Sequence, residues 1–280
     1  MAEKNFEVSV RGMQLRGIRF GQGKPLLALH GWLDNAASFS KLAPLLTGYE
    51  VFAVDLPGHG LSDHLPAQQH YHVWQGTEDV ELLADALGLT EFALMGHSMG
   101  AAIATLYAAV FPQRISHLVL LDALGPLTHE PVQAVDNMRD AILQMKAIKP
   151  EQRVLPAAES FISTRLQGPL ALQQEAAELI VGRAIQAVPG GFCWRSDKRL
   201  KNPSLLRLSN EQLQAFLQAI RAPVLGLFAS DGIYTREFID GRWQHLQANK
   251  ELHWLIGGHH FHLQGDVADV ARRVLAFLGK

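Results

Sequence analysis

The segment FALMGHSMGAAIATLYAAV, residues 92–110, decides the fold. Its first four residues form a short apolar run typical of a buried strand, and its Ala-rich second half favours a helix. Between them, Gly96-His97-Ser98-Met99-Gly100 fits the pattern G-x-S-x-G, whose glycines permit a strained turn with a serine at its apex. A strand, tight turn and helix would lift the Ser98 hydroxyl clear of the sheet. It would then lie beside a helix N-terminus, which favours developing negative charge.

The same stretch is compatible with a membrane span, because residues 92–111 carry no Asp, Glu, Lys or Arg and about 20 apolar residues cross a bilayer. The polar and glycine residues at its centre favour the strand–turn–helix interpretation instead, so we expect no stable membrane insertion. The first residues, Met1–Glu7, lack the apolar core of a signal peptide, which leads us to expect a cytoplasmic protein.

Composition excludes several classes of protein. The 280 residues carry a net charge of −2 without a basic stripe, so we expect no nucleic-acid partner. Cys193 is the single cysteine, which rules out an intramolecular disulfide and disfavours a cysteine-based metal site. The sequence does not indicate an oligomeric state.

Apolar runs alternate with helical patterns on both sides of the serine turn, which predicts an α/β protein with a doubly wound, mostly parallel sheet. A hairpin is expected over residues 6–20 and a helix over 36–47. Residues 125–222 show helical periodicity but no convincing apolar strand, so we interpret them as a helical lid inserted into the sheet. The core is then formed by residues 1–124 and 223–280.

Four polar residues follow predicted strands and should gather at one edge of the sheet. His30, Asp55, Ser98 and Asp122 each stand at a strand end. Ligands of open parallel sheets bind at the carboxyl ends of the strands, so these side chains mark the expected site.

Five segments in this order resemble the α/β-hydrolases of the serine-hydrolase-like type. The segments are His30-Gly31-Trp32-Leu33-Asp34-Asn35, Asp55-x-x-Gly58-His59-Gly60-Leu61-Ser62, the serine turn, Leu120-Leu121-Asp122 and Gly257-Gly258-His259-His260-Phe261-His262-Leu263. The resemblance implies an eight-stranded sheet, an inserted lid and hydrolysis of a carboxylic ester or related small acyl compound through an acyl-enzyme. It implies no metal and no organic cofactor.

The resemblance also implies the catalytic groups, in the chain order serine, acid, histidine. Ser98 is the nucleophile, and His259 aligns with the catalytic histidine, with His260 and His262 as alternatives that otherwise shape the pocket. The acid follows the seventh strand in many members, which offers Asp231, and the sixth strand in a subset, which offers Asp122. We favour Asp122, because the surrounding segment is similar to the esterases of that subset.

An oxyanion needs backbone N–H donors, which the resemblance places at Trp32 and Met99. His30, Leu33, His97, His260 and His262 are possible pocket residues. A metal site built from the three late histidines is disfavoured, because no carboxylate pattern accompanies them. Two other functions stay open. One is different Ser-His-Asp chemistry, such as C–C bond hydrolysis, a lyase or a cofactor-free peroxidase. The other is a non-catalytic ligand-binding module.

Overall fold

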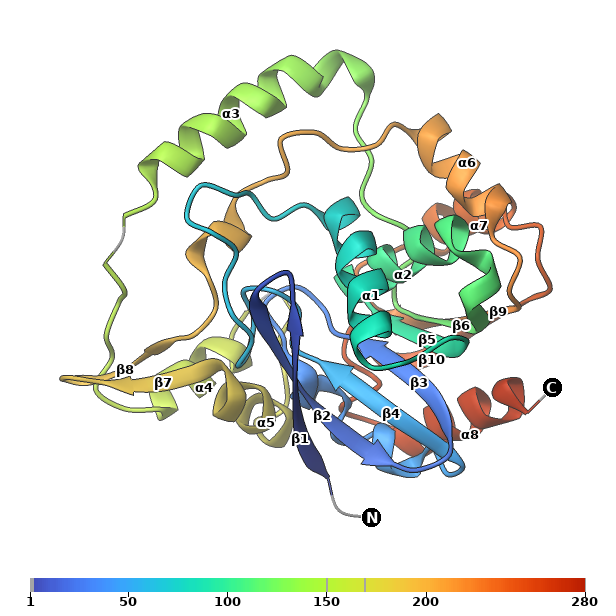
Figure 1. The fold of residues 1–280 in the computed structure, drawn as a ribbon, viewed down its shortest axis with the longest axis horizontal. Coiled ribbons are helices and arrows are strands. Elements are labelled where there is room, and N and C mark those ends of the chain that lie inside the picture. The colour runs from blue at the N-terminus through green and yellow to red at the C-terminus, as the bar shows by residue number, and fades with distance from the viewer. Residues whose placement is uncertain (1–2, 150, 169, 280) are drawn as a thin grey trace.

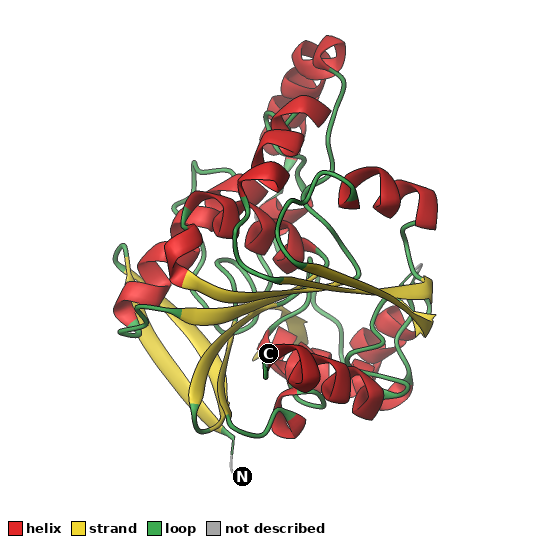
Figure 2. Ribbon diagram, turned by 90° about the vertical axis from the view of Figure 1, so that its right-hand side faces the viewer, coloured by secondary structure: helices red, strands yellow, loops and turns green. Residues whose placement is uncertain are grey.

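A computed structural model describes residues 3–149, 151–168 and 170–279, so the outermost ends of the expected core lie outside the described residues. Its centre is an eight-stranded sheet in which every pair of neighbouring strands is parallel except β1 with β2 and β2 with β4 (Figures 1 and 2). This confirms the predicted doubly wound, mostly parallel sheet. In spatial order the strands are β1 Lys4–Val10, β2 Met13–Gly21, β4 Tyr49–Val54, β3 Lys24–Leu29, β5 Phe92–His97, β6 Ile115–Leu121, β9 Val224–Asp231 and β10 Lys250–Gly258.

The central strands are largely apolar because both faces of the sheet are covered. Every residue of β5 is buried, and the last four residues of β3 have no exposed surface. At the edge, β1 alternates exposed and partly buried residues, as expected for a strand with one solvated face. The expected hairpin over residues 6–20 is confirmed by the antiparallel pairing of β1 with β2.

Helices cover both faces of the sheet, as Figure 2 shows. One face packs against α1 (Gly76–Ala86), α2 (Met99–Val110), α6 (Asn210–Ala219) and α7 (Arg236–Trp243). The other face is covered by α8 (Val267–Leu278) and by the 3-10 helices η1 (Ala36–Phe39) and η2 (Ala43–Leu45).

The expected helix over residues 36–47 is wrong, since the chain forms the two short turns η1 and η2 there. Pro44 has no N–H group to continue a helix through this region. The apolar stretch 92–111 is divided between β5 and α2 by the serine turn. None of the helices in the described ranges is long and apolar enough to cross a bilayer.

The chain between β6 and β9 leaves the sheet and returns. Residues 125–208, here called the cap, contain α3 (Ala134–Ala147), α4 (Glu159–Leu166), α5 (Gln174–Ala184) and the 3-10 helices η5 (Pro131–Gln133) and η6 (Lys198–Lys201). The following helix α6 packs on α2, and its Leu213 and Leu217 belong to the main hydrophobic core.

The cap also contains a two-stranded hairpin that the sequence analysis missed. Strands β7 (Ile185–Val188) and β8 (Gly191–Trp194) pair antiparallel across a turn in which Gly190 and Gly191 have positive φ. Both strands have only four residues, too few for a periodicity signal, although the glycines at the turn were visible in the sequence.

Candidate active site

Ser98 stands on a strained turn between β5 and α2. Its φ of 51° and ψ of −115° are unfavourable for a residue with a side chain, and its N–H donates to Leu121 O at 3.0 Å. The flanking glycines make this turn possible. A Cβ on Gly100 would lie 2.0 Å from Leu29 O, and one on Gly96 would lie 2.4 Å from Gly100 O. The turn therefore holds the serine at the first turn of α2, where the helix dipole favours an anion.

Asp122 and His259 meet at the ends of β6 and β10. Asp122 is fully buried, and its Oδ2 lies 2.6 Å from His259 Nδ1. Its Oδ1 accepts the N–H of Ala229 at 2.9 Å, which fixes the carboxylate in its place. Because Nδ1 donates to the carboxylate, Nε2 of the imidazole is left as a proton acceptor.

Asp231, the other acid that the sequence left open, pairs with Gly258 in the sheet, but among the described residues no hydrogen bond joins its side chain to His259. It is exposed at the end of β9 and accepts the hydroxyl of Ser230 at 3.2 Å. Its neighbour Gly232 packs against the Asp122 carboxylate, since a Cβ there would lie 2.6 Å from Asp122 Oδ2. Of the two candidates, the structure brings Asp122 to the imidazole.

Trp32 lies on the loop after β3, and Met99 belongs to the serine turn itself. Met99 is the first residue of α2, so its N–H belongs to the turn that has no partner within the helix. Trp32 follows β3 in the β3 loop, residues 30–35. The neighbouring Gly31 approaches His97 so closely that a Cβ would lie 2.9 Å from its Nδ1. This approach places the β3 loop beside the turn that carries Ser98.

Comparison with known proteins agrees with this fold. Residues 24–266 match the model of the alpha/beta hydrolase fold. The chain belongs to the α/β-hydrolase family. A serine hydrolase-like protein of Danio rerio is 32% identical to this hydrolase over 241 residues, which cover 83% of this chain and 74% of the relative.

Solved structures of whole chains are also similar to this hydrolase. A hypothetical protein from Pseudomonas aeruginosa superposes with a TM-score of 0.93 and 37% identity, covering 99% of both chains. A thioesterase domain from the curacin biosynthetic pathway superposes with a TM-score of 0.85 and 25% identity, covering 100% of both. The thioesterase domain and the serine hydrolase-like relative support a hydrolase.

His30 stabilises the β3 loop of the hydrolase through hydrogen bonds to the backbone. Its Nδ1 donates to Gly31 O at 2.7 Å and its Nε2 accepts the N–H of Leu56 at 3.0 Å. Burial lowers the pKa of its imidazole to about 4, and the same cause lowers the pKa of the adjacent His59 to about 3. Both rings therefore stay neutral at pH 7 and act as scaffold.

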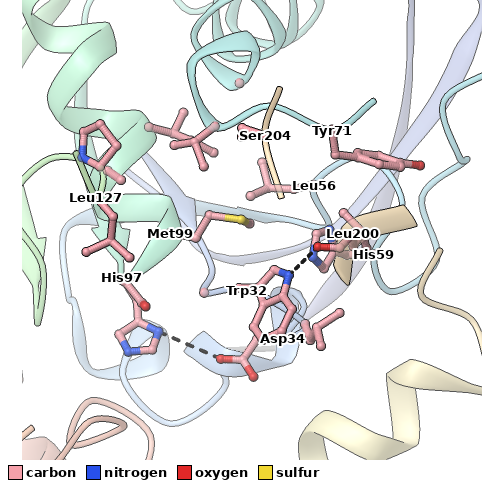
Figure 3. A pocket seen from close by; sticks show the side chains of 18 of the residues that line it. Trp32, Asp34, Leu56, His59, Tyr71, His97, Met99, Leu127, Leu200 and Ser204 are labelled. Atoms are coloured by element: carbon pink, nitrogen blue, oxygen red, sulfur yellow. Dashed lines mark hydrogen bonds and ion pairs between the residues drawn. The ribbon is translucent and has the colours of Figure 1, made fainter. Parts of the chain in front are cut away.

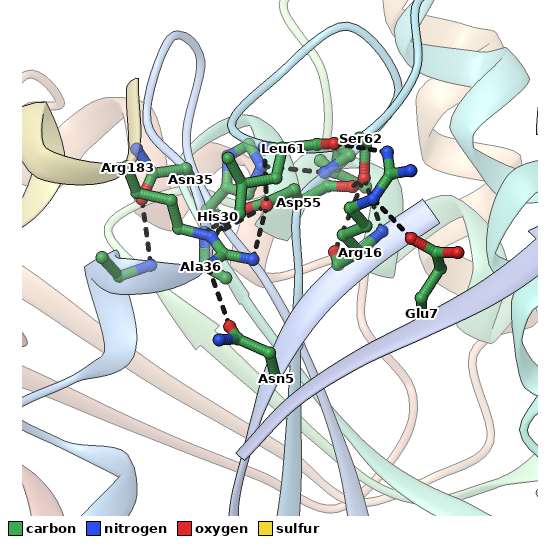
Figure 4. Close-up of polar contacts among 12 residues, drawn as sticks. Asn5, Glu7, Arg16, His30, Asn35, Ala36, Asp55, Leu61, Ser62 and Arg183 are labelled. Carbon is green, nitrogen blue, oxygen red and sulfur yellow. Dashed lines mark hydrogen bonds and ion pairs between the residues drawn. The ribbon is translucent and has the colours of Figure 1, made fainter. Parts of the chain in front are cut away.

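Asp55 also supports the β3 loop, as Figure 4 shows. Its carboxylate accepts the N–H of Ala36 at 2.8 Å and the N–H of Leu61 at 2.9 Å, and it pairs with Arg183 of α5 in the cap at 2.8 Å. A Cβ on Gly60 would lie 2.4 Å from this carboxylate, which explains the glycine at that position. The Asp55 carboxylate thus holds this loop in place.

A buried polar cluster lies beneath Ser98. His97 Nε2 donates to His259 O at 3.0 Å, and His260 Nε2 donates to Asp34 Oδ2 at 3.0 Å. His262 Nε2 lies 2.9 Å from Ser38 Oγ. Burial and the neighbouring imidazoles hold the pKa values of His97 and His262 well below their ordinary range. These histidines therefore tie the histidine loop, residues 257–263, to the serine turn and the β3 loop.

Asp34 is the residue of this cluster that sequence reasoning missed. Burial by itself would raise the pKa of its carboxyl, but His260 and Arg165 outweigh burial and hold that pKa well below its usual range. Arg165 comes from α4 of the cap and contacts Asp34 Oδ1. Because 131 residues separate the two, no local pattern could have paired them.

The same cluster contains side chains of the types that bind metal ions. Asp34, His97 and His260 each offer one ligand atom, all within 4.8 Å of one another, and His97 Nδ1 has no hydrogen-bond partner among the described residues. Asp34, however, already pairs with the Arg165 guanidinium through its other oxygen. A cation here would meet that positive charge, so the donor set fits a hydrogen-bonded network better than a metal site.

A cavity of about 760 Å³ opens above Ser98 and His259, both of which line it. Its walls are largely apolar and include Trp32, Met99 and Leu200, shown in Figure 3. Among the possible pocket residues, the lining includes Leu33, His97 and His260. His30 and His262 do not line it, and their rings contact the N–H of Leu56 and the hydroxyl of Ser38 instead. A cavity of this size and lining suits a small apolar molecule.

Proposed function

We propose that this hydrolase cleaves carboxylic esters through an acyl-enzyme on Ser98. The observation that carries the proposal is the hydrogen bond between His259 Nδ1 and Asp122. His259 lines the same cavity as Ser98, which stands on a strained turn. Serine is a weak nucleophile until a base removes its proton, and a histidine oriented by a buried carboxylate is suited to that task.

The proposed reaction has two stages, acylation of Ser98 and hydrolysis of the acyl-enzyme. His259 Nε2 takes the proton of Ser98 as Oγ attacks the ester carbonyl, and Asp122 stabilises the imidazolium. The N–H groups of Trp32 and Met99 are the proposed donors to the oxyanion. His259 next gives its proton to the departing alcohol. A water, activated by the same histidine, attacks the acyl-enzyme and releases the acid.

The apolar wall of the cavity favours an acyl chain over a charged acyl group, because burying an unpaired charge is costly. A thioester is an alternative substrate by the same mechanism, since the attack is again on a carbonyl carbon. Similarity to a thioesterase domain favours this second candidate.

The test is hydrolysis of nitrophenyl esters with acyl chains of two to twelve carbons, measured for wild type and Ser98→Ala. We expect Ser98-dependent turnover with an optimum above the shortest chain. Turnover that Ser98→Ala leaves intact would contradict the proposal. So would the absence of turnover at every chain length with Ser98 still reactive. That second result would favour C–C hydrolysis, lyase or peroxidase chemistry, whereas an unreactive Ser98 would favour a binding module.

A further inference from the structure

The β3 loop is strained where it carries a proposed oxyanion donor. Leu33, next to Trp32, has a φ of 60°, which a residue with a side chain adopts only when its surroundings impose it. The N–H of Asp34 donates to Gly31 O at 3.1 Å and closes a tight turn around Trp32 and Leu33. Whatever fixes Asp34 therefore also fixes the direction of the Trp32 N–H.

The cap holds this turn through the side chains of the loop itself. The Trp32 indole donates to Leu200 O at 2.8 Å, and the Asn35 amide donates to Ile180 O at 2.8 Å. Asp34 pairs with Arg165. Figure 3 shows the Trp32 contact with Leu200 and the approach of Asp34 to His97.

Unlike Trp32 and Asn35, Asp34 also contacts the histidine loop and lies close to the serine turn. One oxygen accepts His260, the neighbour of the proposed base, and lies 3.9 Å from Nδ1 of His97, the neighbour of Ser98. The Asp34 side chain is 1% exposed, so its charge has little access to water. Arg165 is the permanent cation in contact with it, because a histidine carries charge only when protonated.

We infer that Arg165 is a positioning residue that acts through Asp34 to hold the β3 loop, and with it the Trp32 N–H, in the orientation that stabilises the oxyanion. The inference rests on the proposed ester hydrolysis for its kinetic effect. It assigns to the cap a part in the reaction besides enclosing the substrate. Removing the guanidinium leaves a buried carboxylate without its cation, and the loop relaxes to hydrate or neutralise it.

The experiment compares Arg165→Met with wild type in two assays. The first measures kcat and KM for nitrophenyl acetate, and the second measures the rate at which a fluorophosphonate modifies Ser98. Both reactions place an oxygen in the oxyanion hole, but the second needs no substrate. We expect kcat and the labelling rate each to fall about 10- to 100-fold, with KM for this short ester changed less than threefold.

Three further variants separate positioning from general damage. Arg165→Lys should restore part of the rate because it returns the charge. The double variant Asp34→Asn/Arg165→Met should react about tenfold faster than Arg165→Met alone, because no buried charge is left unpaired. Lys41→Gln is the matched control. It removes another ion pair between core and cap, Lys41 with Glu175, at an exposed position away from the β3 loop, and it should keep the wild-type rates.

Unchanged labelling and kcat in Arg165→Met would overturn the inference. An equal loss in Lys41→Gln, or a double variant no faster than the single one, would also overturn it. If wild type is labelled but hydrolyses no ester, the proposed function fails while the labelling rates still decide the role of Arg165. Thermal unfolding of each variant, measured alongside, ensures that rates are compared between folded proteins.

Discussion

The carboxylate of Asp122 bridges two neighbours at once: Oδ2 contacts His259 Nδ1 at 2.6 Å and Oδ1 accepts the Ala229 N–H at 2.9 Å. Asp122 has a φ of 49°, so its backbone is held in a conformation that L-residues rarely adopt. Strain of this kind persists only where the surroundings fix it, and here it directs the carboxylate toward the histidine loop.

The first prediction concerns the choice between the two acids. Asp122→Asn should lower kcat for ester hydrolysis by about 10⁴-fold, because the amide no longer stabilises the imidazolium or selects its tautomer. Asp231→Asn, at an exposed position one residue before the glycine that packs on Asp122, is the matched control and should retain kcat within about threefold. Steady-state kinetics on one nitrophenyl ester decide the matter, and the reverse ranking would move the acid to Asp231.

A second prediction concerns the reactive serine. A fluorophosphonate should modify the wild-type protein at one residue, and peptide mass spectrometry should locate the adduct on Ser98. Ser98→Ala should abolish the adduct, because no other serine is expected to combine a strained turn with a neighbouring oriented histidine. Labelling that persists elsewhere in Ser98→Ala would show that the nucleophile has been misassigned.

The sequence indicated those parts of the site that carry local signals. The glycines around Ser98 and the position of Asp122 at a strand end were visible in the pattern of residues, and the family resemblance implied His259. The structure brings Asp122 and His259 into contact. The sequence alone could not choose between Asp122 and Asp231 by geometry, because both follow buried strands. The choice depends on which carboxylate turns toward β10, and that is a property of the assembled sheet.

No local sequence pattern indicated the contacts between the cap and the core. Arg165 and Asp34 lie 131 residues apart, and Arg183 and Asp55 lie 128 apart, so their pairing follows from how the cap docks. The sequence analysis predicts a helix over residues 36–47, where the chain forms the short 3-10 helices η1 and η2. Pro44 cannot donate a backbone hydrogen bond there, so one continuous helix does not form.

A third prediction follows from the buried histidines. Burial lowers the pKa of His30 from an ordinary 6.5 to about 4, and lowers that of His59 to about 3. Below pH 6.5 the unfolded chain takes up protons that the folded protein does not. The free energy of unfolding therefore decreases as the pH is lowered. As the pH is lowered from 6.5 to 5, each of these two histidines should reduce the free energy of unfolding by about 2 kcal/mol.

Urea unfolding at pH 7, 6 and 5 measures this loss. His30→Asn should show a shallower dependence than wild type, because one of the groups responsible is gone. Asp34, whose pKa is held below its ordinary 3.8, keeps its stabilising contribution throughout this range and loses it only at lower pH. A free energy of unfolding that stays constant between pH 7 and 5 would contradict the prediction.

The last prediction concerns the close approach that the serine turn requires. Gly100→Ala should destabilise the protein by about 3 kcal/mol or more, because its Cβ would lie 2.0 Å from Leu29 O and two backbone segments would have to separate. That separation would also move Ser98 relative to the β3 loop, so activity should fall in the remaining folded protein. Gly241→Ala in α7 is the control, since a Cβ there meets nothing within 4 Å. It should stabilise the helix by up to about 1 kcal/mol. Chemical denaturation of both variants tests the contrast, and similar stabilities would show that the packing at Gly100 is looser than these distances imply.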